Sequence, residues 1–517
     1  MTQGDQRTIE LGTARLVVRR CLALRERAAA GGICVYLSLL DDEIDDRWER
    51  FLSRCGDATP SAQGWAANAP ELEPTDGVVL LDGSGGVTVL RGCCCAFPLF
   101  FSQQSTGLAV TTELPLLEGS SRLSKSGLLS AMAAPCLQGS YEPNAWTETP
   151  LHGWQRIRRG TLTSFDGSGA PRERAIPIAD SLLDVDKVLE AVGQAFAAYT
   201  FSQRGVASAV LELSGGIDST LAGAAARHEG LVFHGVSVEF PYYEFRFEAT
   251  VQRAVAEALG ITRSVLAGVD LFPYAPSEAW PRFDEPSVFI TGIRHAQAVA
   301  LFAKAQRATR VYTGHGGDAL FSTDLSSSER SGSSPADALF SRAARRAVRA
   351  AVHKAQDTAH LRRDTGCFVY DARQDVWVKE AFGITVRSPF SDLAVVRAAR
   401  LWSRYCAAKG IRPEKTILER ALPGLLPQAV VQRKGKVAYN GVWARAYALH
   451  ADHIARSFEQ AAALLEHVGI SPSWLQRRVR QLEAGDATSD KEVLAAYALC
   501  RWLLAWGFER VGDANWD

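Results

Sequence analysis

The chain has 517 residues, 47% of them hydrophobic, so it is too long for one ordinary domain and can build substantial cores. Its 57 basic and 57 acidic residues cancel, which argues against a nucleic-acid surface or a membrane-binding face. No apolar run reaches the ~18 residues of a membrane span, and no apolar leader follows the polar first residues. Ten cysteines without a Cys-x-x-Cys pair favour reduced thiols and a cytoplasmic location.

The pattern of elements changes near residue 180. Residues 1–175 predict a β-rich layered domain, with apolar runs between polar, glycine-containing turns at 33–39, 77–81 and 86–90. Residues 180–517 predict a second domain, in which a helix at 182–200 is followed by strands at 207–213, 231–238, 263–267 and 310–313. Strands that alternate with helices are typical of an α/β fold with a doubly wound parallel sheet. The ligand site of such a sheet lies at the carboxyl ends of its strands.

The segment 211–220, Leu-Glu-Leu-Ser-Gly-Gly-Ile-Asp-Ser-Thr, carries the clearest chemistry. We expect a strand before it and a helix over 221–228, so the turn between them faces outward-pointing helix amides. Its glycines and hydroxyls suit a phosphate, which would be held by Ser214, Gly215, Gly216 and Ser219. Asp218 suits such a place only if a cation lies between it and the phosphates, and Mg²⁺ is the natural candidate. An ordinary strand-to-helix turn is the alternative.

This segment resembles the pyrophosphate loop of the N-type ATP pyrophosphatases, which include asparagine synthetases, β-lactam synthetases and lasso-peptide cyclases. It is not a Walker A loop, because the Gly-x-x-x-x-Gly-Lys-Ser/Thr spacing is absent. The resemblance implies that ATP is cut between its α and β phosphates, which leaves an acyl-adenylate and pyrophosphate. It also implies that residues 1–175 keep an Ntn-type glutaminase-like fold.

A second glycine-containing segment, 311–321, resembles the Gly-x-Gly-x-Asp-Glu segment of asparagine-synthetase-like enzymes. The matching residues are Gly314, Gly316 and Asp318. Ala319 stands where those enzymes usually carry glutamate. By this resemblance Asp218 and Asp318 together would hold Mg²⁺ against the triphosphate, which suits a hard ion that needs oxygen ligands. A helix-capping aspartate after a glycine turn is the alternative.

The resemblance also places the adenine and the pyrophosphate. The strand at 235–240 should border the adenine through backbone contacts of Ser237 and Val238, and the segment 243–249 should open a helix. The basic segment 431–441 resembles the Arg-x-Lys segment that neutralises departing pyrophosphate. Without a gap the family lysine falls on Gly435, so either Lys434 or Lys436 would fill the role, and Arg433 is structural. The polar segment 321–337 predicts a surface loop or a lid over the ATP site.

The acyl acceptor is inferred from residues that this sequence lacks. Glutamine-dependent asparagine synthetases release ammonia with an N-terminal cysteine, whereas this chain has Thr2 there and its first cysteine is Cys21. β-Lactam synthetases close their ring with a tyrosine-glutamate pair, whereas this chain has His315 and Thr385 at the corresponding positions. His315 is a candidate proton acceptor, or a histidine that satisfies the turn.

The group member that fits best is the lasso-peptide cyclase, which the segments at 214–219, 314–318 and 433–436 and the helical end resemble. The resemblance implies adenylation of an internal Asp or Glu of a leaderless precursor peptide, whose N-terminal amine then closes a macrolactam. ATP and Mg²⁺ would be the cofactors, and a leader peptidase and a leader-recognition protein the partners. The alternatives are a glutamine-independent amide or β-lactam synthetase for a small carboxylic acid, and a non-catalytic scaffold.

Overall fold

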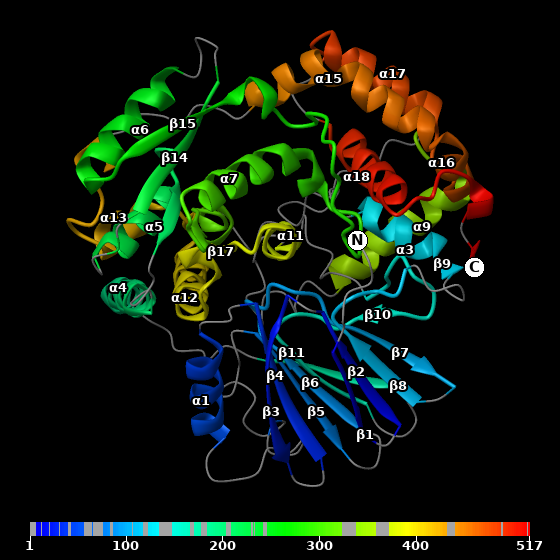
Figure 1. The fold of residues 1–517 in the computed structure, drawn as a ribbon, viewed down its shortest axis with the longest axis horizontal. Coiled ribbons are helices and arrows are strands. Elements are labelled where there is room, and N and C mark those ends of the chain that lie inside the picture. The colour runs from blue at the N-terminus through cyan, green and yellow to red at the C-terminus, as the bar shows by residue number, and fades with distance from the viewer. Residues whose placement is uncertain are drawn as a thin grey trace.

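The computed structural model describes residues 7–11, 13–19, 21–29, 32–39, 43–55, 65, 76–82, 86–105, 107–116, 122–133, 147–165, 170–176, 184–202, 208–228, 231, 233–240, 246–322, 338–357, 372–431, 440–486, 490–513 and 515–516. Figure 1 shows the amino-terminal sheets at the bottom, a parallel sheet with its helices at the upper left, and the carboxyl-terminal helices at the upper right.

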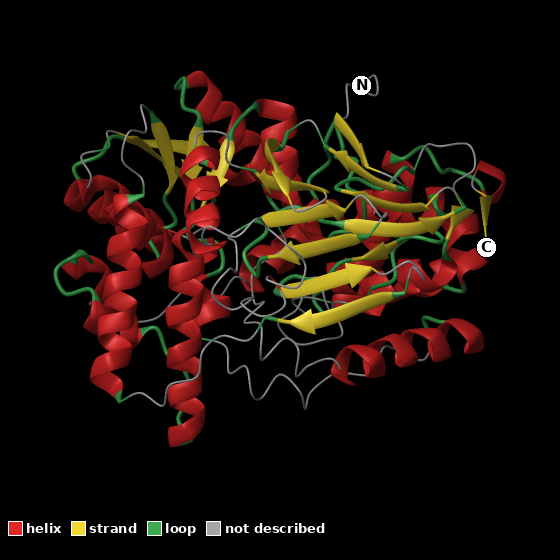
Figure 2. Cartoon of the chain, turned by 90° about the horizontal axis from the view of Figure 1, so that it is seen from below, coloured by secondary structure: helices red, strands yellow, loops and turns green. Residues whose placement is uncertain are grey.

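Two sheets form the amino-terminal part, and their strands run side by side in Figure 2. The five-stranded sheet has the order β1 (Arg7–Leu11), β2 (Ala14–Val18), β8 (Gly107–Thr111), β7 (Phe100–Gln104) and β10 (Gln155–Arg156). The six-stranded antiparallel sheet has the order β12 (Pro171–Ala175), β11 (Thr161–Phe165), β6 (Val87–Arg91), β5 (Gly77–Asp82), β4 (Gly32–Ser38) and β3 (Ala23–Ala29).

The alternation of side chains in these strands produces three layers. Leu16 of β2, Val35 of β4 and Val110 of β8 are fully buried in one core between the two sheets. On the other face of the six-stranded sheet, Tyr36 packs against Trp48 of helix α1 (Ile44–Cys55), with ring centroids 5.9 Å apart. The predicted β-rich layered architecture is therefore confirmed.

A five-stranded parallel sheet forms the centre of the second region. Its order is β15 (Arg263–Ala267), β14 (Phe233–Glu239), β13 (Ala209–Glu212), β16 (Arg310–Tyr312) and β17 (Thr385–Arg387). One face packs on α4 (Val185–Phe201), α5 (Ile217–His228), α6 (Arg246–Leu259), α12 (Leu393–Lys409) and α13 (Thr416–Ala421). The other face packs on α7 (Ile293–Ala305) and α11 (Arg373–Phe382). The predicted doubly wound α/β fold is confirmed.

Helix α5 begins at Ile217, four residues before the predicted start at Leu221. Asp218 therefore lies in the first helical turn, where a negative charge is favoured by the helix dipole. Helix α6 begins at Arg246, inside the segment expected to open a helix.

Two short helices, α8 (Gly317–Phe321) and α14 (Gln428–Val431), join the core on the α5 face of this sheet. The remaining helices share a separate core that also includes amino-terminal residues. They are α3 (Lys125–Ala133), α9 (Arg342–Asp357), α15 (Asn440–Gln460), α16 (Ala462–Val468), α17 (Pro472–Glu483) and α18 (Lys491–Ala505). Short 3₁₀ turns occur at Gly268–Asp270, Val288–Gly292, Pro389–Ser391 and Val511–Asp513, and β9 (Arg122–Leu123) pairs with β18 (Asn515–Trp516). Among the residues that the structure describes, no helix combines the length and the apolar character that a membrane span requires.

One hydrophobic core spans the two predicted domains. Leu128 and Met132 of α3 share it with Tyr274, Ile454 of α15 and Leu499 of α18, and all five side chains are buried. The predicted boundary between residues 175 and 180 stays a prediction.

Buried ion pairs also join the two regions. Glu43, which precedes α1, lies 3.0 Å from Arg387 and 3.4 Å from Arg310 of the parallel sheet, and 2.9 Å from Arg47. Burial alone would raise the pKa of Glu43, but the three guanidinium groups lower it to about 2.

Candidate functional site

The turn between β13 and α5 is closed by its own hydroxyl groups. Ser214 Oγ lies 2.9 Å from Ser219 Oγ, and the Gly216 amide donates to Ser214 Oγ at 3.3 Å. Gly215 has a φ of 77°, a left-handed conformation that glycine adopts without strain. The four predicted phosphate residues thus lie together at the amino end of a 12-residue helix, where an anion is favoured. Phosphate binding itself stays a prediction.

The turn after β16 lies directly against the first turn of α5. β16 and β13 are neighbours in the parallel sheet, so both strands end at the same edge. A Cβ added to Gly314 would lie 2.7 Å from the carbonyl carbon of Asp218, and one added to Gly317 would overlap the Asp218 carboxylate. Gly316, at the start of α8, has a φ of 94°. Glycine is therefore required here for the two turns to touch.

One lysine joins the two predicted metal ligands. Lys415, which precedes α13, places its Nζ 2.6 Å from Asp318 Oδ1 and also forms an ion pair with Asp218 Oδ2. The side chains of Asp218 and Lys415 are 15% and 16% exposed, whereas that of Asp318 is 64% exposed. Sequence reasoning missed Lys415 because it is 197 residues from Asp218 and lies in no recognisable motif.

Two carboxylates that converge on one positive charge fit a hard cation. Within the described ranges, no cluster of three or more His, Cys, Asp or Glu side chains could hold a metal ion. Asp218 and Asp318 would therefore supply two oxygen ligands, and phosphates and water would supply the others, as is common for Mg²⁺ at phosphate sites. This donor set fits a Mg²⁺ ion that arrives with a nucleotide.

The two predicted adenine residues have different surroundings. Ser237 is 1% exposed, and its hydroxyl donates to the Leu213 carbonyl at 2.8 Å. The Leu213 amide donates to the Val236 carbonyl, so the peptide groups of Val236 face β13. The peptide groups of Val238, two residues later in β14, point in the same direction but lie beyond the last residue of β13. The peptide groups of Ser237 face β15 instead. The hydroxyl of Ser237 thus supports the strand, and adenine binding by Ser237 and Val238 stays a prediction.

His315 lies in the turn after β16, where its carbonyl accepts a hydrogen bond from Ser388 Oγ at 2.6 Å. Thr385 is the first residue of β17 and pairs with Arg310, at the opposite end of these strands from His315. The two positions that correspond to the tyrosine-glutamate pair of β-lactam synthetases, His315 and Thr385, therefore do not lie beside each other.

A carboxylate that sequence reasoning missed lies at this edge instead. Glu212, the last residue of β13, has its Oε1 2.6 Å from Nε2 of His295 in the first turn of α7. Burial would raise the pKa of Glu212, but the charges of His295 and His315 and hydrogen bonds from His295 and Thr313 lower it to about 2. Glu212 and His295 are 83 positions apart, so the sequence contains no spacing pattern that links them.

Several predicted residues lie outside the described residues. They are Thr2, the loop 323–337, and Arg433, Lys434, Gly435 and Lys436. Their roles stay predictions. None of the eight described cysteines forms a disulfide bond with another of them. Burial raises the pKa of Cys21 well above its usual value, which makes its thiolate unfavourable.

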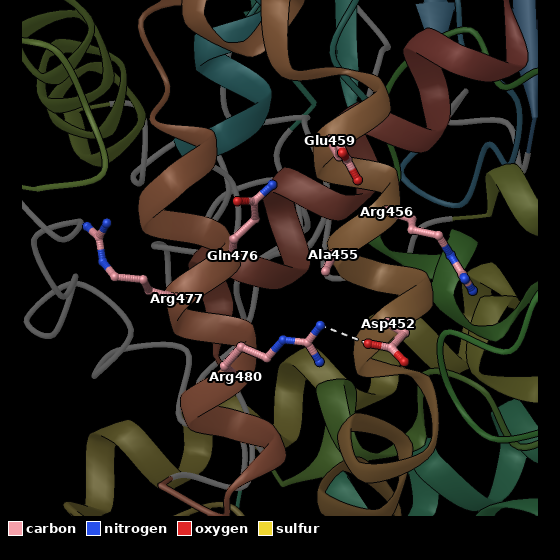
Figure 3. A pocket seen from close by; sticks show the side chains of 7 residues that line it. All are labelled: Asp452, Ala455, Arg456, Glu459, Gln476, Arg477 and Arg480. Atoms are coloured by element: carbon pink, nitrogen blue, oxygen red, sulfur yellow. Dashed lines mark hydrogen bonds and ion pairs between the residues drawn. The ribbon is translucent and has the colours of Figure 1, made fainter.

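A pocket of about 480 Å³ lies elsewhere, between α15 and α17. Figure 3 shows its lining, which is Asp452, Ala455, Arg456, Glu459, Gln476, Arg477 and Arg480. The ion pair between Arg480 and Asp452, at 2.8 Å, crosses it. The pocket contains none of the predicted site residues.

A family model described as asparagine synthase matches residues 187–504. No curated protein matches the chain. Among solved structures, the chain is similar to the NMN synthetase of Francisella tularensis, with 11% identity over 46% of this chain and 92% of that chain and a TM-score of 0.20. It is also similar to a glutamine-dependent NAD+ synthetase of Acinetobacter baumannii in complex with ADP, with 14% identity over 66% of this chain and 49% of that chain and a TM-score of 0.18. At such TM-scores neither likeness bears on function. The family model covers more than half of the chain and both glycine turns, so the chain belongs to the asparagine synthase family of ATP-dependent, amide-bond-forming ligases.

Proposed function

We propose that this ligase is a lasso-peptide cyclase. It adenylates the side chain of an internal Asp or Glu of a leaderless precursor peptide, and the N-terminal amine of the same peptide attacks the adenylate. The products are a macrolactam, AMP and pyrophosphate. The observation that carries the proposal is the convergence of two glycine turns, Asp218 and Asp318 on one cation position, with histidine at position 315.

The residues of the two turns would have different roles in the adenylation step. Hydroxyls of Ser214 and Ser219 and the first amides of α5 would bind the phosphates. Asp218 and Asp318 would hold Mg²⁺, which supplies charge neutralisation at the phosphate oxygens. The substrate carboxylate forms a bond to the α phosphorus, and the bond to the β phosphate breaks. Lys415, together with Lys434 or Lys436, would then neutralise the departing pyrophosphate.

In the second step the peptide amine attacks the adenylate, and the protein has to hold the two groups in place and accept a proton. A peptide amine has a pKa near ~8, so a useful fraction is neutral at pH 7. Holding the folded peptide with its amine in line with the adenylate supplies much of the acceleration. We propose that a leader peptidase and a leader-recognition protein deliver this peptide.

The test uses the full chain, ATP, Mg²⁺ and a leader-free peptide with Asp or Glu at ring distance from its N-terminus. We expect AMP and a peptide product that is lighter by one water. The matched control is the same peptide with Asn or Gln at the acceptor position, and a second control is N-acetylated. Formation of AMP and an amide on a small carboxylic acid, without any peptide product, would instead establish the small-molecule synthetase.

A further inference from the structure

Glu212 and His295 form an ion-paired hydrogen bond at the edge of the sheet where the two glycine turns lie. Glu212 ends β13, one residue before Leu213 and the phosphate turn, and His295 comes from the first turn of α7 on the other face. The two side chains are 22% and 30% exposed, so the pair is partly buried and remains partly accessible to solvent.

The groups around the pair fix its orientation. Thr313, which follows β16 and is 2% exposed, donates a hydrogen bond to Glu212, and the charge of His315 from the same turn also acts on Glu212. Arg294, the neighbour of His295 on α7, directs its Nη1 to Gln297 at 3.4 Å. In a neutral His295 ring, the proton on Nε2 is donated to Glu212, so the lone pair is on Nδ1.

We infer that His295 and Glu212 act as a proton-accepting pair, in which His295 accepts the proton of the attacking amine and Glu212 orients the ring. The inference rests on the proposed function, because it requires an amine that attacks an adenylate. The arrangement is that of a histidine base held by a carboxylate, a pairing that recurs on unrelated folds. Glu212 lies just before the first glycine turn, and His295 lies outside both glycine segments.

The step balances without another reactant. The amine nitrogen forms a bond to the acyl carbon, the bond from that carbon to the AMP oxygen breaks, and AMP leaves with the electron pair. The extra proton on the nitrogen goes to Nδ1 of His295. Burial lowers the pKa of His295, but the charge and the hydrogen bond of Glu212 more than offset this and raise it. A raised pKa brings the base closer to the pKa of the amine, near ~8, which improves proton transfer.

The experiment measures the two steps separately in His295→Gln, Glu212→Gln and His315→Gln, with His353→Gln of the exposed face of α9 as the matched control. Peptide-dependent exchange of labelled pyrophosphate into ATP reports adenylation, and mass spectrometry reports ring closure. We expect His295→Gln to keep exchange within about twofold and to lose roughly a hundredfold in ring closure. Glu212→Gln should lose roughly tenfold, and added imidazole should restore ring closure in His295→Ala.

The pH profile separates a base from a structural pair. Ring closure by the wild type should depend on the ionisation of both His295 and the amine, and His295→Gln should retain only the rise of the amine, at about pH 8. Equal losses of exchange and ring closure in both His295→Gln and Glu212→Gln, or full ring closure in either, would overturn the inference. If His315→Gln, and not His295→Gln, leaves only the rise of the amine, the base is His315. Exchange without any ring closure by the wild type would overturn the proposed function itself, and the inference with it.

Discussion

At the scale of single residues, Asp318 is the more exposed of the two candidate Mg²⁺ ligands. Asp318→Asn removes a carboxylate that would bind the Mg²⁺ ion of the nucleotide but that the fold does not require. We expect AMP formation to fall by roughly a hundredfold or more, with an unchanged midpoint of thermal unfolding. Asp486→Asn is the matched control, because Asp486 is 54% exposed and also ion-paired, with Arg478. Normal turnover in Asp318→Asn would remove this residue from the Mg²⁺ site.

Lys415 neutralises both carboxylates when no nucleotide is bound. Lys415→Met leaves two neighbouring negative charges, so it should tighten the binding of Mg²⁺ alone while it slows AMP formation by roughly tenfold or more. Calorimetric titration with Mg²⁺ and the AMP assay measure the two effects. Lys409→Met, at the exposed end of α12, should change neither. Weaker Mg²⁺ binding in Lys415→Met would mean that the lysine does not compete for these carboxylates.

At the scale of elements, the turn after β16 depends on the missing side chain of Gly314. Gly314→Ala would push a methyl group into the backbone of Asp218 and Ser219, so the two turns must separate. We expect at least tenfold slower AMP formation and a lower unfolding midpoint. Gly512→Ala is the control, since a Cβ there meets nothing within 4 Å. If Gly314→Ala retains full activity, close contact of the turns is not needed for adenylation.

The sequence predicted the elements of the parallel sheet better than their contacts. Strands such as β13 were recognisable because buried parallel strands are apolar on both faces, and Val210 and Leu211 are both fully buried. The helix predicted over 221–228 begins at Ile217 instead, because Ile217 and Asp218 belong to its first turn and not to the loop before it. Lys415 and the pair of Glu212 with His295 could not be predicted, because only the folded chain brings such distant residues together.

At the scale of the whole molecule, Glu43 ties the amino-terminal layers to the parallel sheet. Its pKa is lowered to about 2, so its contribution to stability is present above the unfolded value of about 4.5 and is lost as the pH falls toward 2. Glu43→Gln should destabilise the protein at pH 7 by about 3 kcal/mol, because three guanidinium groups lose their shared carboxylate.

The difference between wild type and Glu43→Gln should shrink as the pH is lowered from 5 to 2, because the unfolded chain and then the folded protein bind a proton at Glu43 over this range. Thermal unfolding at a series of pH values measures it. Asp45→Asn is the control, because Asp45 is 72% exposed and ion pairs at the surface contribute little to stability. A pH-independent difference would show that Glu43 does not act through its charge.

The core that α3 shares with α15 and α18 has a consequence for how the chain is made. During synthesis the amino-terminal sheets emerge first, and the apolar face of α3 stays uncovered for more than 200 residues until α9 follows, with α18 later still. An uncovered apolar face of this kind invites aggregation, so the nascent chain should depend on chaperones. For the same reason, the two regions produced as separate polypeptides should be poorly soluble alone and should recover when they are expressed together.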